Sequence, residues 1–227
     1  MAPATILAAM LTLGRPGASP YSMVDLPECG TNARQKPTIC PVEARWDPHW
    51  GAWVRRETKD EARARWQRIA ATIAQEVRAA TRGDAPVWDG SASDLARAVV
   101  TVAFHESGFR RDVHAGRGYL GLGDCTTQER VRRCRSFCLM QISTGGPDGE
   151  QHGVRGRDLV GVDDEATTRC IAVGIRALAK VKGGGTGKRM FRETIARYGG
   201  GSLSAVGTPW VAERVRTFER VEEVTLR

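Results

Sequence analysis

One carboxylate in this sequence occupies a position suited to acid–base chemistry. Glu106 continues the apolar helical stripe of Leu95 and Val102, and Gly108 follows where such a helix would end. Burial on an apolar helix face disfavours the charged form of a carboxyl group, and a carboxyl group that keeps its proton near neutral pH can serve as a general acid. Tyr198 is a candidate hydrogen-bond partner that would orient this acid. We therefore predict that Glu106 is a catalytic acid.

The competing interpretation is that Glu106 forms a buried ion pair. Most of the 34 basic residues are arginines, so guanidinium partners are plentiful. A guanidinium beside a carboxylate favours its charged form and makes it a poor acid. The surroundings of the Glu106 carboxyl group therefore decide between the two interpretations.

Three short motifs follow one another in a distinctive order. Glu106-Ser107-Gly108-Phe109 comes first, Leu139-Met140-Gln141-Ile142 second, and Ala196-Arg197-Tyr198-Gly199-Gly200 third. This order resembles the lysozyme-like lytic transglycosylases of the SLT type, relatives of goose-type lysozyme, in which E-S-x-F ends a helix, G-L-M-Q-I follows and A-Y-N-x-G closes the cleft. The resemblance covers about residues 90 to 222. Cys138 stands where the family has a glycine, and Gly199 stands where it has an asparagine.

The resemblance implies a function and a set of site residues. Glu106 would be the single catalytic acid, and the substrate would be contacted by Ser107, Met140, Gln141 and Tyr198. The bond cleaved would join N-acetylmuramic acid to N-acetylglucosamine in the glycan strands of peptidoglycan. Glu106 would first protonate this bond and then accept the proton of the muramyl 6-hydroxyl, which attacks C1 to give a 1,6-anhydro sugar. No metal or organic cofactor is implied.

Two other functions remain open at this stage. In a hydrolase similar to goose-type lysozyme, Asp112 or Asp124 would position a water molecule opposite Glu106. In a catalytically silent peptidoglycan-binding or assembly module, the arginines would hold anionic polymer and the cleft would only dock glycan. A role in wall remodelling, in a secretion machine or in a phage is compatible with any of the three.

Helical periodicity is the strongest structural signal, and the resemblance implies a mainly α, or α+β, lysozyme-like bundle around a glycan-binding cleft. We expect one helix to run from an N-cap at Ser93 to Gly108. Other helices are expected over residues 59–82, 127–135, 163–181, 191–197 and 209–221. Trp46, Trp50 and Trp53 have the spacing of one face of a short core-packed helix, with an aromatic sugar platform as the alternative. No strand signal is comparable.

The chain divides at about residue 57. Residues 1–57 are expected to form a signal-like, irregular N-terminal arm, and residues 58–227 the transglycosylase domain. Residues 1–14 are apolar but carry no basic residue ahead of the apolar run, so they fit either a secretory signal or a mature N-terminal helix. No stretch is long and apolar enough to span a bilayer, which excludes a multi-pass transporter.

Six cysteines predict an oxidising compartment, periplasmic or extracellular, and up to three disulfides. Cys29 and Cys40 would close a short loop in the arm. The other four would clip a polar insertion, residues 110–136, to the following helix: Cys125, Cys134, Cys138 and Cys170. A zinc site that adds His114 or His152 to three sulfurs is the alternative, but no C-x-x-C pair is present.

The net charge and the remaining motifs indicate which classes of partner and cofactor to expect. A net charge of +8 favours acidic partners, of which cell-wall polymers are one class, while no nucleic-acid-binding motif accompanies the charge. Residues 116–121 match G-x-G-x-x-G, but they lie after a helix and before a cysteine-bearing loop, not between a strand and a helix. We therefore expect peptidoglycan as the partner and no dinucleotide cofactor.

Overall fold

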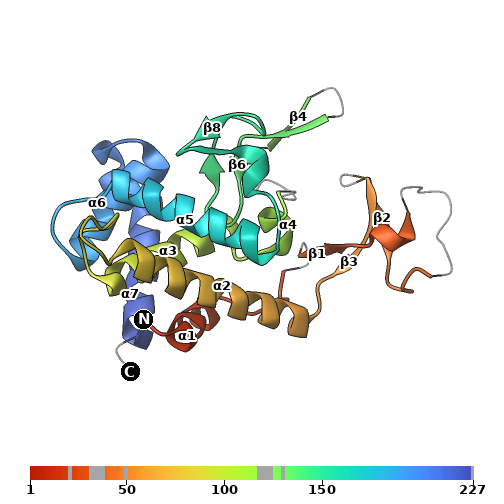
Figure 1. Cartoon of the computed structure of the whole chain (residues 1–227), viewed down its shortest axis with the longest axis horizontal. Coiled ribbons are helices and arrows are strands. Elements are labelled where there is room, and N and C mark those ends of the chain that lie inside the picture. Colours follow the sequence, from red (N-terminus) through yellow and green to blue (C-terminus); the bar gives the residue numbers. More distant parts are fainter. Residues whose placement is uncertain (20–21, 31–38, 49–50, 117–124, 129–130, 226–227) are drawn as a thin grey trace.

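Two long helices, α2 (Lys59–Ala80) and α5 (Asp164–Lys180), lie side by side, and both contact the helix that follows α2 in the chain (Figure 1). The computed structural model describes residues 1–19, 22–30, 39–48, 51–116, 125–128 and 131–225. Thr58 and Glu61 form a capping box at the start of α2, and Asp163 caps α5 by accepting from the backbone N–H of Ala166 at 2.8 Å. Both helices lie where the sequence periodicity predicts them.

Helix α3 (Ala92–Ser107) forms the centre of the core. Every residue from Asp94 to Ala103 is buried, and α3 contacts α1, α2, α5, α6 (Gly187–Gly200) and α7 (Pro209–Thr225). The predicted N-cap at Ser93 is wrong by two residues. The hydroxyl of Ser91 accepts from the backbone N–H of Asp94 at 2.9 Å, so the helix begins one residue after Ser91.

Helix α1 (Pro3–Leu13) belongs to the same core. Ile6, Ala9 and Met10 are fully buried, and the helix packs against α2 and α7. In this structure the segment is therefore a helix packed on the core. Within the described residues, no helix is long and apolar enough to cross a membrane.

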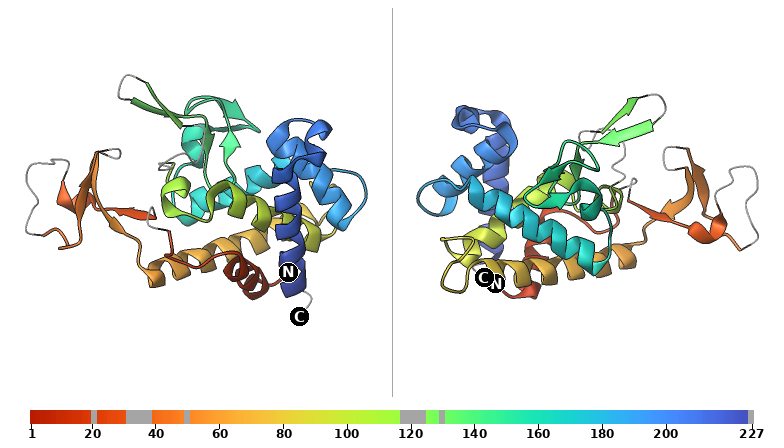
Figure 2. Two further views of the ribbon diagram at one scale, coloured as in Figure 1. Left: turned by 180° about the vertical axis from the view of Figure 1, so that it is seen from behind. Right: turned by 45° about the horizontal axis from the view of Figure 1, so that its top comes forward.

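The rest of the N-terminal arm is a small antiparallel sheet with the strand order β1-β3-β2. It comprises β1 (Met23–Asp25), β2 (Arg45–Asp47) and β3 (Ala52–Arg56), and a 3-10 turn, η1 (Pro27–Cys29), follows β1. The predicted disulfide between Cys29 and Cys40 is present. Figure 2 shows that the sheet extends beyond the N-terminal end of α2, away from the helical body.

The tryptophan helix expected in this arm is wrong. Trp46 on β2 lies opposite Trp53 on β3, and the two rings meet edge to face with centroids 6.0 Å apart. Trp50 lies outside the described residues. Trp53 is nonetheless buried, in a small cluster with the Cys29–Cys40 disulfide, and Trp46 is half-buried against it, so core packing is confirmed for Trp53. Cross-strand pairing places both rings on one face, as helical spacing also would.

A buried ion-pair network joins the sheet to the helices. The Glu57 carboxylate accepts from Arg65 Nε at 2.7 Å and Nη2 at 2.8 Å, and from Ser22 Oγ at 2.7 Å. A guanidinium nitrogen of Arg111, on α4 (Arg111–His114), lies 3.8 Å from the same carboxylate. Burial raises the pKa of Glu57, but the hydrogen bonds and positive charges around it lower the pKa by more, so the group is ionised.

Short hairpins fill the region between α4 and α5. Strands β4 (Cys125–Gln128) and β5 (Val131–Cys134) pair with Cys125 opposite Cys134, so the helix expected over residues 127–135 is wrong. The other elements there are β6 (Ser136–Phe137), β7 (Ile142–Ser143), β8 (Glu150–Gln151), β9 (Val154–Arg155) and the 3-10 turn η2 (Gly156–Leu159). The described chain is therefore mainly helical with small antiparallel sheets, as an α+β protein is.

Candidate active site

The first motif lies at the C-terminal end of α3. Gly108 adopts the left-handed conformation (φ 58°) and its N–H bonds the carbonyl of Phe104 at 2.7 Å, which ends the helix as predicted. The Ser107 hydroxyl is fully buried, donates to the carbonyl of Ala103 at 2.7 Å and accepts from the N–H of Phe109 at 3.2 Å. Ser107 therefore stabilises the helix end and cannot contact a substrate, contrary to the prediction.

Glu106 faces α7 and forms an ion pair there. Arg214 Nη2 donates to Glu106 Oε1 at 3.1 Å, and the two side chains are 17% and 22% exposed respectively. The Arg214 guanidinium also lies over the Trp210 ring, 4.9 Å from its centroid. The structure therefore contains the arginine ion pair of the competing interpretation, supplied by a residue 108 positions away, and the apolar surroundings expected for Glu106 are wrong.

The neighbouring histidine lies on the same side. His105 Nε2 is 2.8 Å from Thr217 Oγ1, one turn along α7 from Arg214. Burial, followed by the positive charge of Arg214, lowers the pKa of His105 to about 4, so the ring is neutral near pH 7. Arg214 is not among the residues predicted from the sequence, although its spacing of four residues from Trp210 on the last predicted helix places both on one face.

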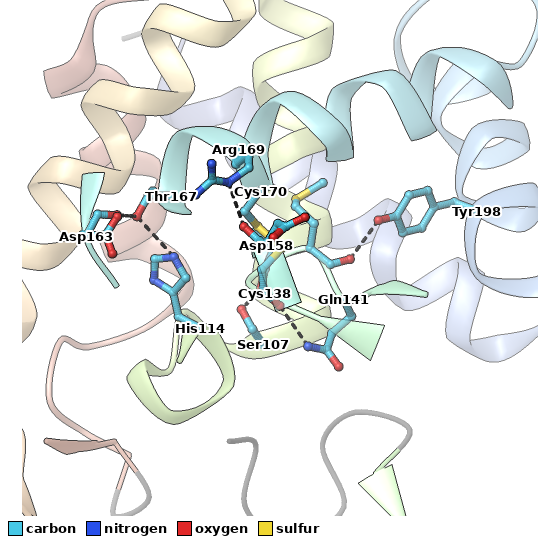
Figure 3. The surroundings of a disulfide bond; sticks show 12 residues. Ser107, His114, Cys138, Gln141, Asp158, Asp163, Thr167, Arg169, Cys170 and Tyr198 are labelled. Carbon is cyan, nitrogen blue, oxygen red and sulfur yellow. Dashed lines mark hydrogen bonds between the residues drawn. A yellow bond between two sulfur atoms is a disulfide. The ribbon is translucent and has the colours of Figure 1, made fainter. Parts of the chain in front are cut away.

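The second motif forms a tight turn that is fixed to α5. Cys138 (φ 61°) and Gln141 (φ 49°) both adopt the left-handed conformation, and Cys138 is joined by a disulfide to Cys170 (Figure 3). A Cβ atom added to Gly174 of α5 would lie 2.7 Å from Met140 Cγ, so the turn packs closely on this helix. Met140 is fully buried and serves the core, not a ligand as the resemblance implies.

The third motif is hydrogen-bonded to the second. The Tyr198 hydroxyl on α6 donates to the backbone carbonyl of Met140 at 2.8 Å, a contact visible in Figure 3. Burial, followed by the negative charge of Glu106, raises the pKa of Tyr198 well above its usual value. The hydrogen bond of Tyr198 therefore goes to the second motif and not to the predicted acid.

A pocket of about 270 Å³ opens beside Gln141 and Tyr198. Gln141 Nε2 donates to the carbonyl of Cys138 at 2.9 Å, whereas Gln141 Oε1 is buried and has no hydrogen-bond partner among the described residues. Of the four predicted substrate-binding residues, Gln141 and Tyr198 line this pocket, while Ser107 and Met140 are buried in the core.

The other candidate residues do not assemble into a second site. Asp112 is fully buried and forms an ion pair with Arg110, so it is not placed to hold a water molecule for a hydrolase, and Asp124 lies outside the described residues. Cys138 and Cys170 form a disulfide, which removes Cys138 from the zinc alternative. Within the described ranges, no three His, Cys, Asp or Glu side chains are grouped to hold a metal ion.

Comparisons with known proteins add no assignment. No family model, no curated protein and no solved structure matches this chain. The order of the three motifs and the contact between the second and the third are therefore the basis for any functional conclusion.

Proposed function

We propose that this protein cleaves the bond between N-acetylmuramic acid and N-acetylglucosamine in peptidoglycan, with Glu106 as the acid and base. One observation supports this proposal above the others. Segments from the turn after β6 and from α6, far apart in the sequence, meet through the hydrogen bond of Tyr198 to the Met140 carbonyl, and α3, which carries Glu106, packs against α6. The three segments resemble the motifs of the lysozyme-like lytic transglycosylases and follow one another in the same order.

The ion pair with Arg214 affects the two halves of this reaction in opposite ways. Protonation of the glycosidic oxygen needs a neutral Glu106, which Arg214 opposes by favouring the carboxylate. Acceptance of the 6-hydroxyl proton needs the carboxylate, which Arg214 favours. Only one hydrogen bond joins the pair, and both side chains are partly exposed, so a polar substrate group can replace the contact. In this proposal Glu106 leaves Arg214 when glycan binds.

The same ion pair favours a second candidate function, a peptidoglycan-binding module that does not cleave glycan. If Arg214 stays on Glu106 in the complex, the carboxylate remains charged and supplies no proton. The pocket beside Gln141 and Tyr198 would then only hold a polar ligand.

Digestion of purified peptidoglycan, followed by mass spectrometry, separates these functions. The wild-type protein is expected to release 1,6-anhydro ends, and Glu106→Gln to lower the rate about a hundredfold or more. Arg214→Gln is expected to raise the rate severalfold, whereas Arg216→Gln, on an exposed position of the same helix, leaves it unchanged.

Four other results would contradict the proposal or change it. Reducing ends would identify a hydrolase, and retention on peptidoglycan without cleavage would identify the binding module. Equal cleavage by wild type and Glu106→Gln would remove Glu106 as the acid. A slower Arg214→Gln variant with normal binding would show that Arg214 assists the chemistry instead of opposing it.

A further inference from the structure

The pocket beside Gln141 and Tyr198 has a marked charge asymmetry. Two cationic side chains and a histidine line it, Lys180, Arg197 and His152, and none of its described lining residues is acidic. Arg197 is already engaged, since Nη1 donates to the carbonyls of Val181 at 3.3 Å and Lys182 at 2.9 Å. Lys180 is exposed at the end of α5 and forms no ion pair with any other described residue. The pocket therefore offers one ammonium group to an anion.

Backbone strain is concentrated in the same place. Four described residues other than glycine have a positive φ, and two of them, Gln141 (49°) and His152 (55°), line this pocket. A third, Cys138, belongs to the turn that carries Gln141. Such conformations are unfavourable for residues with a Cβ atom and gather at binding sites, where they aim side chains.

The two strained residues present complementary groups. Gln141 Oε1 is a buried acceptor without a donor among the described residues, and Figure 3 shows the amide oxygen directed away from the turn. Burial, followed by the charges of Lys180 and Arg176, lowers the pKa of His152, so its ring is a neutral hydrogen-bonding group near pH 7. A ligand that fits must bring an N–H or O–H donor to Gln141 and a negative charge to Lys180.

We infer that this pocket binds the peptide portion of the substrate, through a peptide carboxylate on Lys180 and a peptide N–H on Gln141. This inference rests on the proposed function, because peptidoglycan is a glycan whose muramyl residues carry short peptides with free carboxylates. In this inference His152, at the tip of the β8–β9 hairpin, contacts the same peptide portion of the substrate. The protein then prefers glycan that carries peptides over bare glycan. Of the residues that cause this preference, Gln141 belongs to the second motif, whereas Lys180 and His152 lie outside the three motifs.

The test measures binding by calorimetry to the full-length Glu106→Gln protein, so that cleavage does not consume the ligand. The ligands are a disaccharide of N-acetylglucosamine and N-acetylmuramic acid carrying a pentapeptide, the same compound with its peptide carboxyls amidated, and the disaccharide without peptide. Lys180→Gln is expected to weaken binding of the pentapeptide compound about tenfold and to leave binding of the amidated compound and of the bare disaccharide unchanged. Lys188→Gln, which removes the same charge outside the pocket, is the control.

A second variant tests the role of the strained histidine. His152 and Gly153 (φ 76°) form a two-residue hairpin turn with positive φ at both positions, for which Asn-Gly is the favoured pair. His152→Asn is therefore expected to keep or raise stability while it weakens binding of the pentapeptide compound severalfold.

An equal loss for all three ligands, no effect of Lys180→Gln, or no binding of the pentapeptide compound would overturn the inference. The proposed function is judged separately, by cleavage with the wild-type protein. If the wild-type protein does not cleave peptidoglycan but Lys180→Gln still weakens binding of the pentapeptide compound alone, the proposed activity fails and the peptide site stands.

Discussion

At the scale of single residues, Cys138 is the most informative position. It occupies the place of a glycine in the motif that the second segment resembles, and it adopts a left-handed conformation that glycine reaches without strain. For a residue with a Cβ atom this conformation costs about 1–2 kcal/mol. The buried disulfide to Cys170 of α5 holds the residue there. Cysteine therefore replaces the conformational freedom of glycine with a covalent constraint.

This account predicts different outcomes for two double variants. Cys138→Ala with Cys170→Ala loses the bond and keeps the strain, so its free energy of unfolding should fall by about 2–4 kcal/mol. Cys138→Gly with Cys170→Ala should recover about 1 kcal/mol of that loss, because glycine adopts the turn freely. Urea denaturation measures both. A glycine variant no more stable than the alanine variant would contradict a strained Cys138.

At the scale of elements, α1 packs into the main core although its composition also fits a signal sequence. Its apolar side chains face α2 and α7 and contribute fully buried residues to the main core. Figures 1 and 2 show α1 beside the C-terminal part of α7, so the first and last described helices pack together. Loss of this helix would expose apolar surface on both partners.

Substitutions on opposite faces of α1 test this packing. Ile6→Ala removes a fully buried side chain and is expected to lower the free energy of unfolding by about 2–5 kcal/mol. Leu11→Ala, at a position that is 39% exposed, should change it by less than about 0.5 kcal/mol. Chemical denaturation of both variants gives the comparison. Equal small effects would show that α1 is not part of the cooperative core.

At the scale of the whole molecule, buried ionisable groups connect the N-terminal sheet, α4 and α5. His114 of α4 is fully buried, with Nε2 3.2 Å from Thr167 Oγ1 of α5 (Figure 3). The Thr167 hydroxyl donates to the carbonyl of Asp163 at 2.7 Å, so His114 must be the donor in their contact and is protonated at Nε2. Burial, followed by the charges of Arg65 and Arg111, lowers the pKa of His114 to about 3.

This depressed pKa makes stability depend on pH in a definite direction. Between about pH 6.5 and 3 the unfolded chain binds a proton at His114 that the folded chain does not, so the free energy of unfolding falls as the pH falls. This one group contributes about 1.4 kcal/mol per pH unit. Denaturation at several pH values from 7 to 5 should show the decline, and His114→Gln should reduce its slope. An unchanged slope in the variant would contradict a neutral buried His114.

The sequence by itself determined the elements whose causes are local. Apolar spacing and capping residues are contained within one helix, which is why α2, α5 and the end of α3 lie where they were expected. The strands are two to five residues long, too short to show the alternation of apolar and polar residues that marks a strand. The sequence therefore predicts helices at Trp46 and over residues 127–135, where the structure has strands. Their conformation depends on the partner strand.

Only the tertiary structure decided what surrounds the candidate acid. Arg214 reaches Glu106 because α7 packs against α3, and no pattern near residue 106 shows that contact. The same holds for the pocket, where Lys180, His152 and Gln141 come from a helix end, a hairpin tip and a turn. Electrostatic environment is set by groups close in space, and most of those groups are distant in sequence.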